Sequence, residues 1–178
     1  MQWSNAPIVG FVSLLALAAW FDARQRRVPN ALALVVLGAA LGGVLVGAAP
    51  AARLSSALLG VLTGLALWLP FWLLRLLGAG DVKFFAAASA WVGPSLAVKA
   101  ALVAALMGGL LGLIMLVQRR GWQETSALVR TTIAMPAGAI VDVSAAPSDE
   151  RTLPYAIPMA IALGVTAVFP DYMRKVLF

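Results

Sequence analysis

The sequence predicts an all-α, polytopic integral membrane protein, a single membrane-embedded domain over residues 1–178 with about six transmembrane helices. Of the 178 residues, 62% are hydrophobic and only 11% are charged, and the mean hydropathy is +0.96. A soluble domain of this size cannot cover so much apolar surface. The apolar residues also gather in runs separated by short basic segments, which is the pattern of successive bilayer crossings.

The residue types that are missing exclude several kinds of site. The chain has no cysteine and no histidine, so it has no disulfide, no thiolate nucleophile and no imidazole general base, and it lacks the usual zinc ligands. The net charge of +6 is interpreted as basic loops that set the topology and contact anionic lipid. We therefore expect no cofactor, no metal and no nucleic-acid partner.

The first half of the chain predicts three helices. Ile8 to Phe21 is apolar, and no Lys or Arg precedes it, whereas a secretory signal peptide begins with basic residues. A first helix from about Asn5 to Asp22 therefore enters from outside, and the arginines between Asp22 and Asn30 indicate a cytoplasmic loop. Ala31 to Gly47 and Leu54 to Leu77 predict the second and third helices.

The second half predicts three more helices. Asp81 to Trp91 is too short to cross about 30 Å of hydrocarbon alone. We expect a fourth helix that crosses a thin or sheltered region, with a re-entrant helix as the alternative. Ser95 to Val117 predicts the fifth helix and Leu153 to Phe169 the sixth. Between them lies a long polar loop, in which Ser126 to Ile140 is an amphipathic surface segment.

The basic residues favour a topology with both termini outside and six crossings. Most of the 13 Lys and Arg residues lie in segments that this topology puts inside, where positive charge accumulates. The inside group is Arg24, Arg26, Arg27, Arg75, Lys83, Arg119, Arg120, Arg130 and Arg151. The outside group is Arg53, Lys99, Arg174 and Lys175.

A few residues within the helices indicate how the helices sit in the bilayer. Trp68 and Trp72 are interpreted as part of an aromatic belt at the membrane interface. Lys99 is expected to extend its ammonium group outward toward water. The glycines from Gly108 to Gly112 offer the fifth helix a face for close packing.

Two acids lie at the edges of apolar segments, in a chain where acids are scarce. Asp22 ends the first helix, and Asp81 follows Gly80 at the start of the fourth. An Asp at membrane depth costs about 2.5–3.5 kcal/mol and therefore indicates function. The topology puts both carboxyl groups at the cytoplasmic edge, where one holds a proton while the other acts as a base toward water. Such a pair hydrolyses a peptide bond without a metal or cofactor.

Other interpretations of the two acids stay open at this point. Asp22 can pair with Arg26 one helical turn later, and Asp81 can cap the fourth helix or lie in its first turn. A small transporter would bind a proton or cation with the same two carboxylates, although its charged groups are expected near the midplane. A structural subunit of a secretion machine would tolerate Asn at both positions.

Three segments resemble motifs of the prepilin peptidases, or type IV leader peptidases. The first motif of that family, an Asp followed by basic residues and Ile/Val-Pro-Asn, is similar to Asp22-Ala23-Arg24-Gln25-Arg26-Arg27-Val28-Pro29-Asn30. Its Gly-x-Gly-Asp-x-Lys motif is similar to Gly78-Ala79-Gly80-Asp81-Val82-Lys83. The segment that opens its last helix resembles Leu153-Pro154-Tyr155-Ala156-Ile157-Pro158. The resemblance extends from about residue 8 to residue 169.

The resemblance implies an integral-membrane aspartic endopeptidase of the bacterial inner membrane that cleaves prepilin and pseudopilin leaders at the cytoplasmic face. It implies that Asp22 and Asp81 are catalytic and that the remaining motif residues position the substrate, namely Gly78, Gly80, Lys83, Arg27, Pro29, Asn30, Pro154 and Tyr155. The implied partners are the prepilin, the lipid bilayer and pilus or secretion machinery. Longer members carry a Cys-x-x-Cys region and also methylate the product, whereas this chain resembles the short form found with tight-adherence (Flp) pili.

Overall fold

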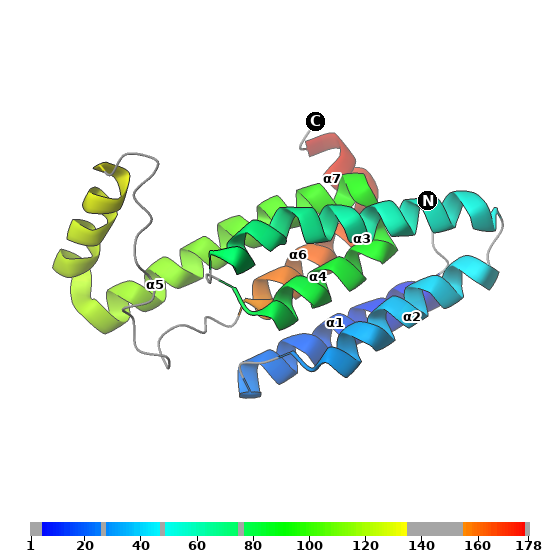
Figure 1. Cartoon of the computed structure of the whole chain (residues 1–178), viewed down its shortest axis with the longest axis horizontal. Helices are drawn as coiled ribbons and strands as arrows, with labels where there is room; N and C mark the ends of the chain where they lie inside the picture. The colour runs from blue at the N-terminus through cyan, green and yellow to red at the C-terminus, as the bar shows by residue number, and fades with distance from the viewer. Residues whose placement is uncertain (1–4, 26–27, 47–48, 75–76, 135–154, 177–178) are drawn as a thin grey trace.

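A computed structural model describes residues 5–25, 28–46, 49–74, 77–134 and 155–176, and within them every regular element is a helix. The helices are α1 (Asn5–Gln25), α2 (Asn30–Val46), α3 (Pro50–Leu73), α4 (Ala79–Val92), α5 (Pro94–Ala134), α6 (Ala156–Val168) and α7 (Pro170–Val176). From α1 to α6, successive helices lie alongside one another and run in alternating directions (Figure 1). One end of this bundle holds the end of α1 and the starts of α2, α4 and α6. We call it the Asp22 end.

The all-α membrane fold predicted from composition is confirmed. Three helical segments are long and apolar enough to cross a bilayer, namely Ile8–Gln25, Pro50–Leu73 and Pro94–Met115, and α2 and α6 are shorter apolar helices. Large apolar side chains such as Leu34, Leu45, Leu62 and Leu106 are more than half exposed. Such a surface suits helices that face lipid rather than water.

α4 is the helix around which the others pack. Its 14 residues rise roughly 21 Å at about 1.5 Å each, less than the hydrocarbon thickness of about 30 Å. α2, α3 and α6 pack against it, and every residue from Phe84 to Trp91 is buried. The short fourth helix is therefore sheltered by its neighbours, as the sequence predicts.

Two glycines of α3 let that helix lie directly against α4. A Cβ atom added at Gly64 would be 2.8 Å from Oγ of Ser89, and one at Gly60 would overlap the Ser89 carbonyl oxygen. Helices in lipid associate through close packing of this kind, because lipid tails are as apolar as the helices themselves. The Ser89 hydroxyl is satisfied within α4, donating to the carbonyl oxygen of Phe85 at 2.7 Å. The contact fixes the position of α4, whose first turn carries Asp81.

The far end of α4 is held by α1 and α2. The rings of Phe11 and Trp91 stack with their centroids 4.7 Å apart. Nε1 of Trp91 donates to the carbonyl oxygen of Val36 at 2.9 Å. α4 is thus anchored along its whole length.

α3 begins and ends four residues earlier than the predicted range of Leu54 to Leu77. Pro50 stands at the start of the helix, where its fixed φ is favourable and its missing N–H has no intrahelical partner to lose. At the other end, the N–H of Leu74 donates to the carbonyl oxygen of Pro70 at 3.0 Å and closes the last turn. Apolar residues continue on both sides, so hydropathy alone did not locate these ends.

α5 is longer than predicted. It continues to Ala134, with a break at Gly121, whose φ of 78° and ψ of 164° are not helical. Glycine adopts such a positive φ without steric cost. The first part of the predicted polar loop, residues 118–134, is therefore helical on both sides of Gly121, and the predicted amphipathic segment is helical as far as Ala134. The remainder of that loop lies outside the described residues.

The prediction that Lys99 extends toward water is wrong. Lys99 is only 7% exposed, and its Nζ donates to the carbonyl oxygen of Met173 at 2.8 Å. The acceptor belongs to α7, a helix of 7 residues that no sequence pattern predicted. Burying an ammonium group is unfavourable unless it is hydrogen-bonded, so the carbonyl of Met173 makes the buried position possible and ties α5 to α7.

Candidate active site

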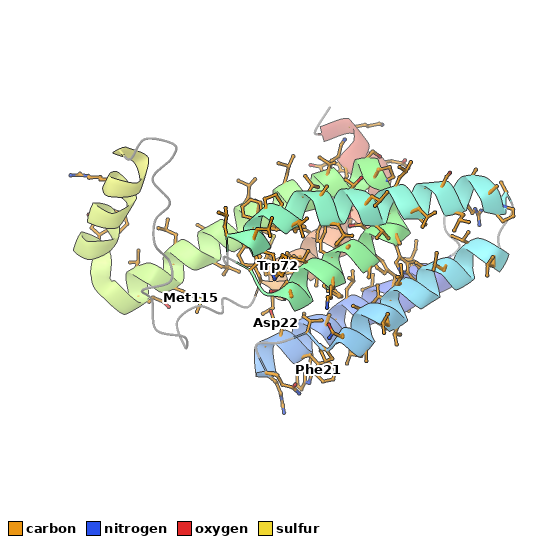
Figure 2. The ribbon with its side chains drawn as sticks, viewed as in Figure 1. Phe21, Asp22, Trp72 and Met115 are labelled. Carbon is orange, nitrogen blue, oxygen red and sulfur yellow. The ribbon has the colours of Figure 1, made fainter. Side chains whose placement is uncertain are left out.

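Asp22 lies in the last turn of α1 and is bound by the start of α6. Its side chain is 2% exposed, and its Oδ2 accepts the N–H of Ala156 at 2.9 Å. Ala156 is the first residue of α6, and the residue before it, Tyr155, supplies no side-chain cap. The first N–H groups of a helix have no partner within the helix and favour a negative charge. Asp22 therefore caps α6 from a different helix, at the end of the bundle where α4 also begins (Figure 2).

Asp81 lies in the first turn of α4, folded back over Gly78. Its own N–H donates to the carbonyl oxygen of Gly78 at 3.2 Å, and the backbone of Gly78 bonds in return to its carboxylate. A Cβ atom at Gly78 would be 3.2 Å from Oδ2 of Asp81. A side chain at this position would crowd the carboxylate, so the first glycine of the motif leaves room for it.

Gly80 joins the first two motifs. A Cβ atom added at Gly80 would be 3.1 Å from the carbonyl oxygen of Val28, which is closer than ordinary van der Waals contact. Val28 is buried and directly precedes Pro29, whose carbonyl oxygen accepts the N–H of Leu32 at 3.0 Å in the first turn of α2. The segment that leads from α1 into α2 therefore lies against the turn that carries Asp81.

Asp22 and Asp81 lie close enough for the charge of one to act on the other. A carboxylate near a second negative charge ionises less readily than an isolated one. Acid–base catalysis on water and a peptide carbonyl uses one group that takes a proton and another that gives one. Among the described residues, no group of three or more acids gathers as a metal site.

A cluster of Tyr155, Trp68, Phe85 and Gly108 holds the donor to Asp22. The phenol ring of Tyr155 lies across Gly108 of α5, and a Cβ atom there would overlap it. The ring of Trp68 meets that of Tyr155 edge-on, with centroids 5.9 Å apart, and meets Phe85 at 5.5 Å. Because Tyr155 directly precedes Ala156, this Tyr155 cluster fixes the amide that binds Asp22.

The prediction that Trp68 belongs to an aromatic belt at the membrane interface is wrong, because Trp68 is buried. Trp72, one helical turn later, is exposed on the surface of α3. Trp68 is 2% exposed, whereas Trp72 is 41% exposed. Nε1 of Trp68 is buried and has no acceptor among the described residues. One helical turn separates the two tryptophans, and Trp68 is on the face of α3 that packs against α4 and Tyr155.

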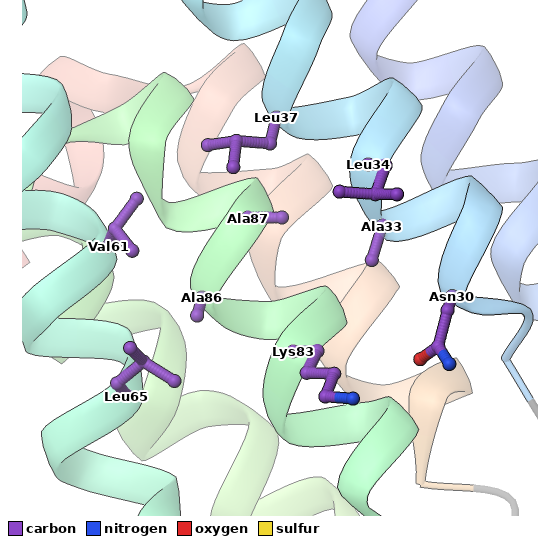
Figure 3. Close-up of a pocket in the computed structure, with 9 residues that line it drawn as sticks. All are labelled: Asn30, Ala33, Leu34, Leu37, Val61, Leu65, Lys83, Ala86 and Ala87. Carbon is purple, nitrogen blue, oxygen red and sulfur yellow. The ribbon is translucent and has the colours of Figure 1, made fainter.

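Of the motif residues not yet placed, the structure describes two, Lys83 and Asn30. Lys83 and Asn30 stand at one end of a groove of about 440 Å³ between α2, α3 and α4 (Figure 3). Both side chains lie at the Asp22 end of the bundle, since α2 and α4 begin there. Arg27 and Pro154 lie outside the described residues.

The structural interpretations of the two acids account for part of this arrangement. Arg26, the suggested partner of Asp22, lies outside the described residues, and the Asp22 carboxylate binds the Ala156 amide. Asp81 does lie in the first turn of a helix, as a structural role requires. Capping α6 and occupying the first turn of α4 each need one carboxylate. A second carboxylate close by is unfavourable, because two negative charges repel each other. The proximity of the two acids is what a purely structural role leaves unexplained.

Two contacts of the site were not expected from the sequence. One is the backbone amide of Ala156, and a backbone donor carries no signal in the residue type. The other is Gly108, which belongs to the predicted packing face and meets Tyr155, whereas Gly109 has open space beside it. Glycine spacing predicted that some of these residues pack, and only the arrangement of α5 and α6 decides which.

Comparison with known proteins identifies one family. The sequence model of the type IV leader peptidase family matches residues 9–113. This range contains both aspartates, the segment between α1 and α2, and the glycine motif of α4. No curated protein and no solved structure matches the chain.

Proposed function

The chain belongs to the type IV leader peptidase family, and from that premise we propose that it is an aspartic endopeptidase that removes the leaders of type IV prepilins and pseudopilins. Its apolar helices make it a multi-pass membrane protein, and we place it in the bacterial cytoplasmic membrane with the Asp22 end facing the cytoplasm. The single observation that carries the aspartic mechanism is that α1 ends and α4 begins at the same end of the bundle, where the charge of Asp22 acts on Asp81.

In the proposed reaction the two carboxyl groups act on water and on the scissile peptide. The ionised one takes a proton from water, whose oxygen adds to the carbonyl carbon, while the other gives its proton to the carbonyl oxygen. As the C–N bond breaks, a proton passes to the leaving nitrogen. The leader then ends in a carboxyl group, and the remaining chain begins with a free amine.

The fixed contacts of each aspartate support this assignment. The Ala156 amide holds the Asp22 carboxylate, and Gly78 holds that of Asp81. A carboxylate that is already positioned loses little freedom when the water and the peptide bind. The Tyr155 cluster then acts indirectly, by keeping the Ala156 amide in its place.

A proton- or cation-coupled transporter is the competing function. Asp22 lies in the last turn of α1, and Asp81 is the third residue of α4. Coupling ions in transporters bind near the middle of the bilayer, at breaks within the helices. Acids at helix ends fit a reaction at the membrane edge, so the peptidase is favoured.

The direct test is to incubate the purified protein with a co-expressed prepilin and to sequence the N-terminus of the product. We expect one cut that separates the leader from the remaining chain. The same preparation in liposomes under a pH gradient should carry no proton flux. Flux without cleavage would make the protein a transporter and would refute the proposal.

The Tyr155 cluster gives a matched prediction on neighbouring glycines. We expect Gly108→Ala to lower kcat by about 10–100-fold, because the new methyl group displaces Tyr155 and with it the amide of Ala156. Gly109→Ala should leave kcat unchanged, since nothing lies within 4 Å of that position. Steady-state cleavage rates of the two variants check this. An equal loss in both would mean that the effect comes from α5 as a whole rather than from Tyr155.

A further inference from the structure

α3 carries none of the motif residues, yet its contacts with α4 lead toward the turn of Asp81. A Cβ atom added at Gly64 would be 2.8 Å from Oγ of Ser89. One turn later on α3, and one turn earlier on α4, the rings of Trp68 and Phe85 meet with their centroids 5.5 Å apart. Phe85 in turn follows Asp81 by one helical turn. Trp68 is therefore in contact with the helix face on which Asp81 lies.

Trp68 also contacts the residue that precedes the donor to Asp22. Its ring lies edge-on to that of Tyr155, with the centroids 5.9 Å apart. Ala156, the next residue, donates its N–H to Oδ2 of Asp22 at 2.9 Å. Through one ring contact on each side, Trp68 therefore connects the donor to Asp22 with the helix that carries the second acid.

The indole N–H of Trp68 does not explain why this residue is a tryptophan. The side chain is 2% exposed, and Nε1 has no acceptor among the described residues. A buried donor without an acceptor lowers the stability of a fold. The contribution of Trp68 is instead a large, rigid ring. It meets the rings of Phe85 and Tyr155 at 65° and 70°, angles at which aromatic pairs attract each other edge to face.

We propose that Trp68 is a positioning residue for the reaction, whose ring sets the spacing between the carboxyl groups of Asp22 and Asp81. This inference rests on the proposed function, because it assigns Trp68 to the same pair. Asp22 is bound by the start of α6, Asp81 lies in the first turn of α4, and the ring of Trp68 contacts both elements. A smaller ring would let these two elements shift, and a displacement of about 1 Å in a catalytic group can cost ~10²-fold in rate.

Trp68→Phe makes the ring smaller and tests the spacing directly. Phenylalanine cannot fill the place of an indole, so the contacts with Phe85 and Tyr155 loosen. We expect kcat for leader cleavage to fall about tenfold while KM stays unchanged, because the buried ring does not contact the substrate. Trp122→Phe is the matched control. Trp122 is 69% exposed on α5, and its replacement should leave both constants unchanged.

A second replacement separates the ring of Trp68 from its N–H group. The amino acid 3-benzothienylalanine, incorporated at position 68, keeps the two fused rings and has sulfur in place of the N–H. This protein should retain the wild-type kcat, and it should unfold at a higher temperature because a buried donor without an acceptor has been removed. A loss of kcat as large as in Trp68→Phe would mean that the N–H donates to water or substrate during the reaction, and would overturn the proposal.

Hydrogen exchange of two backbone amides reports on the spacing without any substrate. The N–H of Ala156 is bound by the Asp22 carboxylate, and that of Asp81 by the turn that begins α4. In Trp68→Phe both amides should exchange about tenfold faster, because their local contacts open more often. The amide of Ala90, at the far end of α4, should exchange as in the wild type. NMR of protein labelled with ¹⁵N-alanine and ¹⁵N-aspartate measures all three amides, and the exposed-tryptophan control and the benzothienylalanine protein should match the wild type.

Three further outcomes would overturn the assignment of Trp68. An unchanged kcat in Trp68→Phe would mean that the spacing does not depend on the ring. Exchange that rises equally at all three amides would make Trp68 an ordinary core residue, whose loss loosens the whole bundle. A higher KM with an unchanged kcat would put the ring in substrate binding. Failure of the wild type to cleave a prepilin would instead overturn the proposed function, and the exchange rates would still show whether Trp68 holds the two amides.

Discussion

We expect Asp22→Asn and Asp81→Asn each to abolish leader cleavage, with a fall in kcat of about 10⁴-fold or more, as for other catalytic residues that act as one unit. An amide can neither take a proton from water nor donate one as a carboxylic acid does. Both variants should fold, because the side-chain oxygen of Asn at position 22 can still accept the N–H of Ala156. Initial rates of the purified variants, together with their helical content by circular dichroism, check this result.

The double variant and a control sharpen this prediction. If the carboxyl groups share one proton, Asp22→Asn combined with Asp81→Asn should be little worse than either single change. Asp171 is an exposed acid in the first turn of α7, and Asp171→Asn should retain full activity. Retained cleavage in Asp81→Asn, with loss in Asp171→Asn, would mean that Asp81 is not a catalytic residue. A structural subunit would tolerate all of these changes.

We expect Gly80→Val to lower the rate of leader cleavage by about 100-fold. The variant should still insert into the membrane. The Cβ atom of any side chain at position 80 would lie 3.1 Å from the Val28 carbonyl oxygen, so the two branches of valine force the first turn of α4 away from Val28. Asp81 is the next residue, and a displacement of about 1 Å in a catalytic group can cost ~10²-fold in rate. Cleavage rates and membrane fractionation of the variant measure the two effects separately.

A graded series and an open glycine serve as controls for Gly80→Val. Gly80→Ala adds only the one tight contact and should fall between the wild type and the valine variant. Gly38 of α2 has nothing within 4 Å of its Cβ position, so Gly38→Val should cleave normally. Full activity of Gly80→Val would mean that the contact with Val28 does not position Asp81.

The sequence predicted what depends on local pattern. Apolar runs located the helices of the bundle, and the short run before Gly93 indicated a sheltered helix, which became α4. Asp22 and Asp81 stood out because acids are rare in apolar segments. Alternating helix directions then put both acids at one end of the bundle.

Local sequence patterns did not predict the contacts between segments that are distant in the chain. The side chain of Lys99 reaches a backbone carbonyl of α7, and Asp22 reaches a backbone amide of α6. Any residue type supplies such groups, so neither partner is visible in the sequence. Trp68 illustrates the same limit, because its placement depends on which face of α3 meets α4 and Tyr155.

The bond between Asp22 and the Ala156 amide has a consequence for the timing of synthesis. Its two partners are 134 residues apart in the chain, and at about 5–20 residues per second the ribosome adds Ala156 roughly 7–27 seconds after Asp22. Until then Asp22 lacks its donor, although α1 to α4 have already been made. The bond that holds the Asp22 carboxylate can therefore form only after the ribosome has made the start of α6, later than both aspartates.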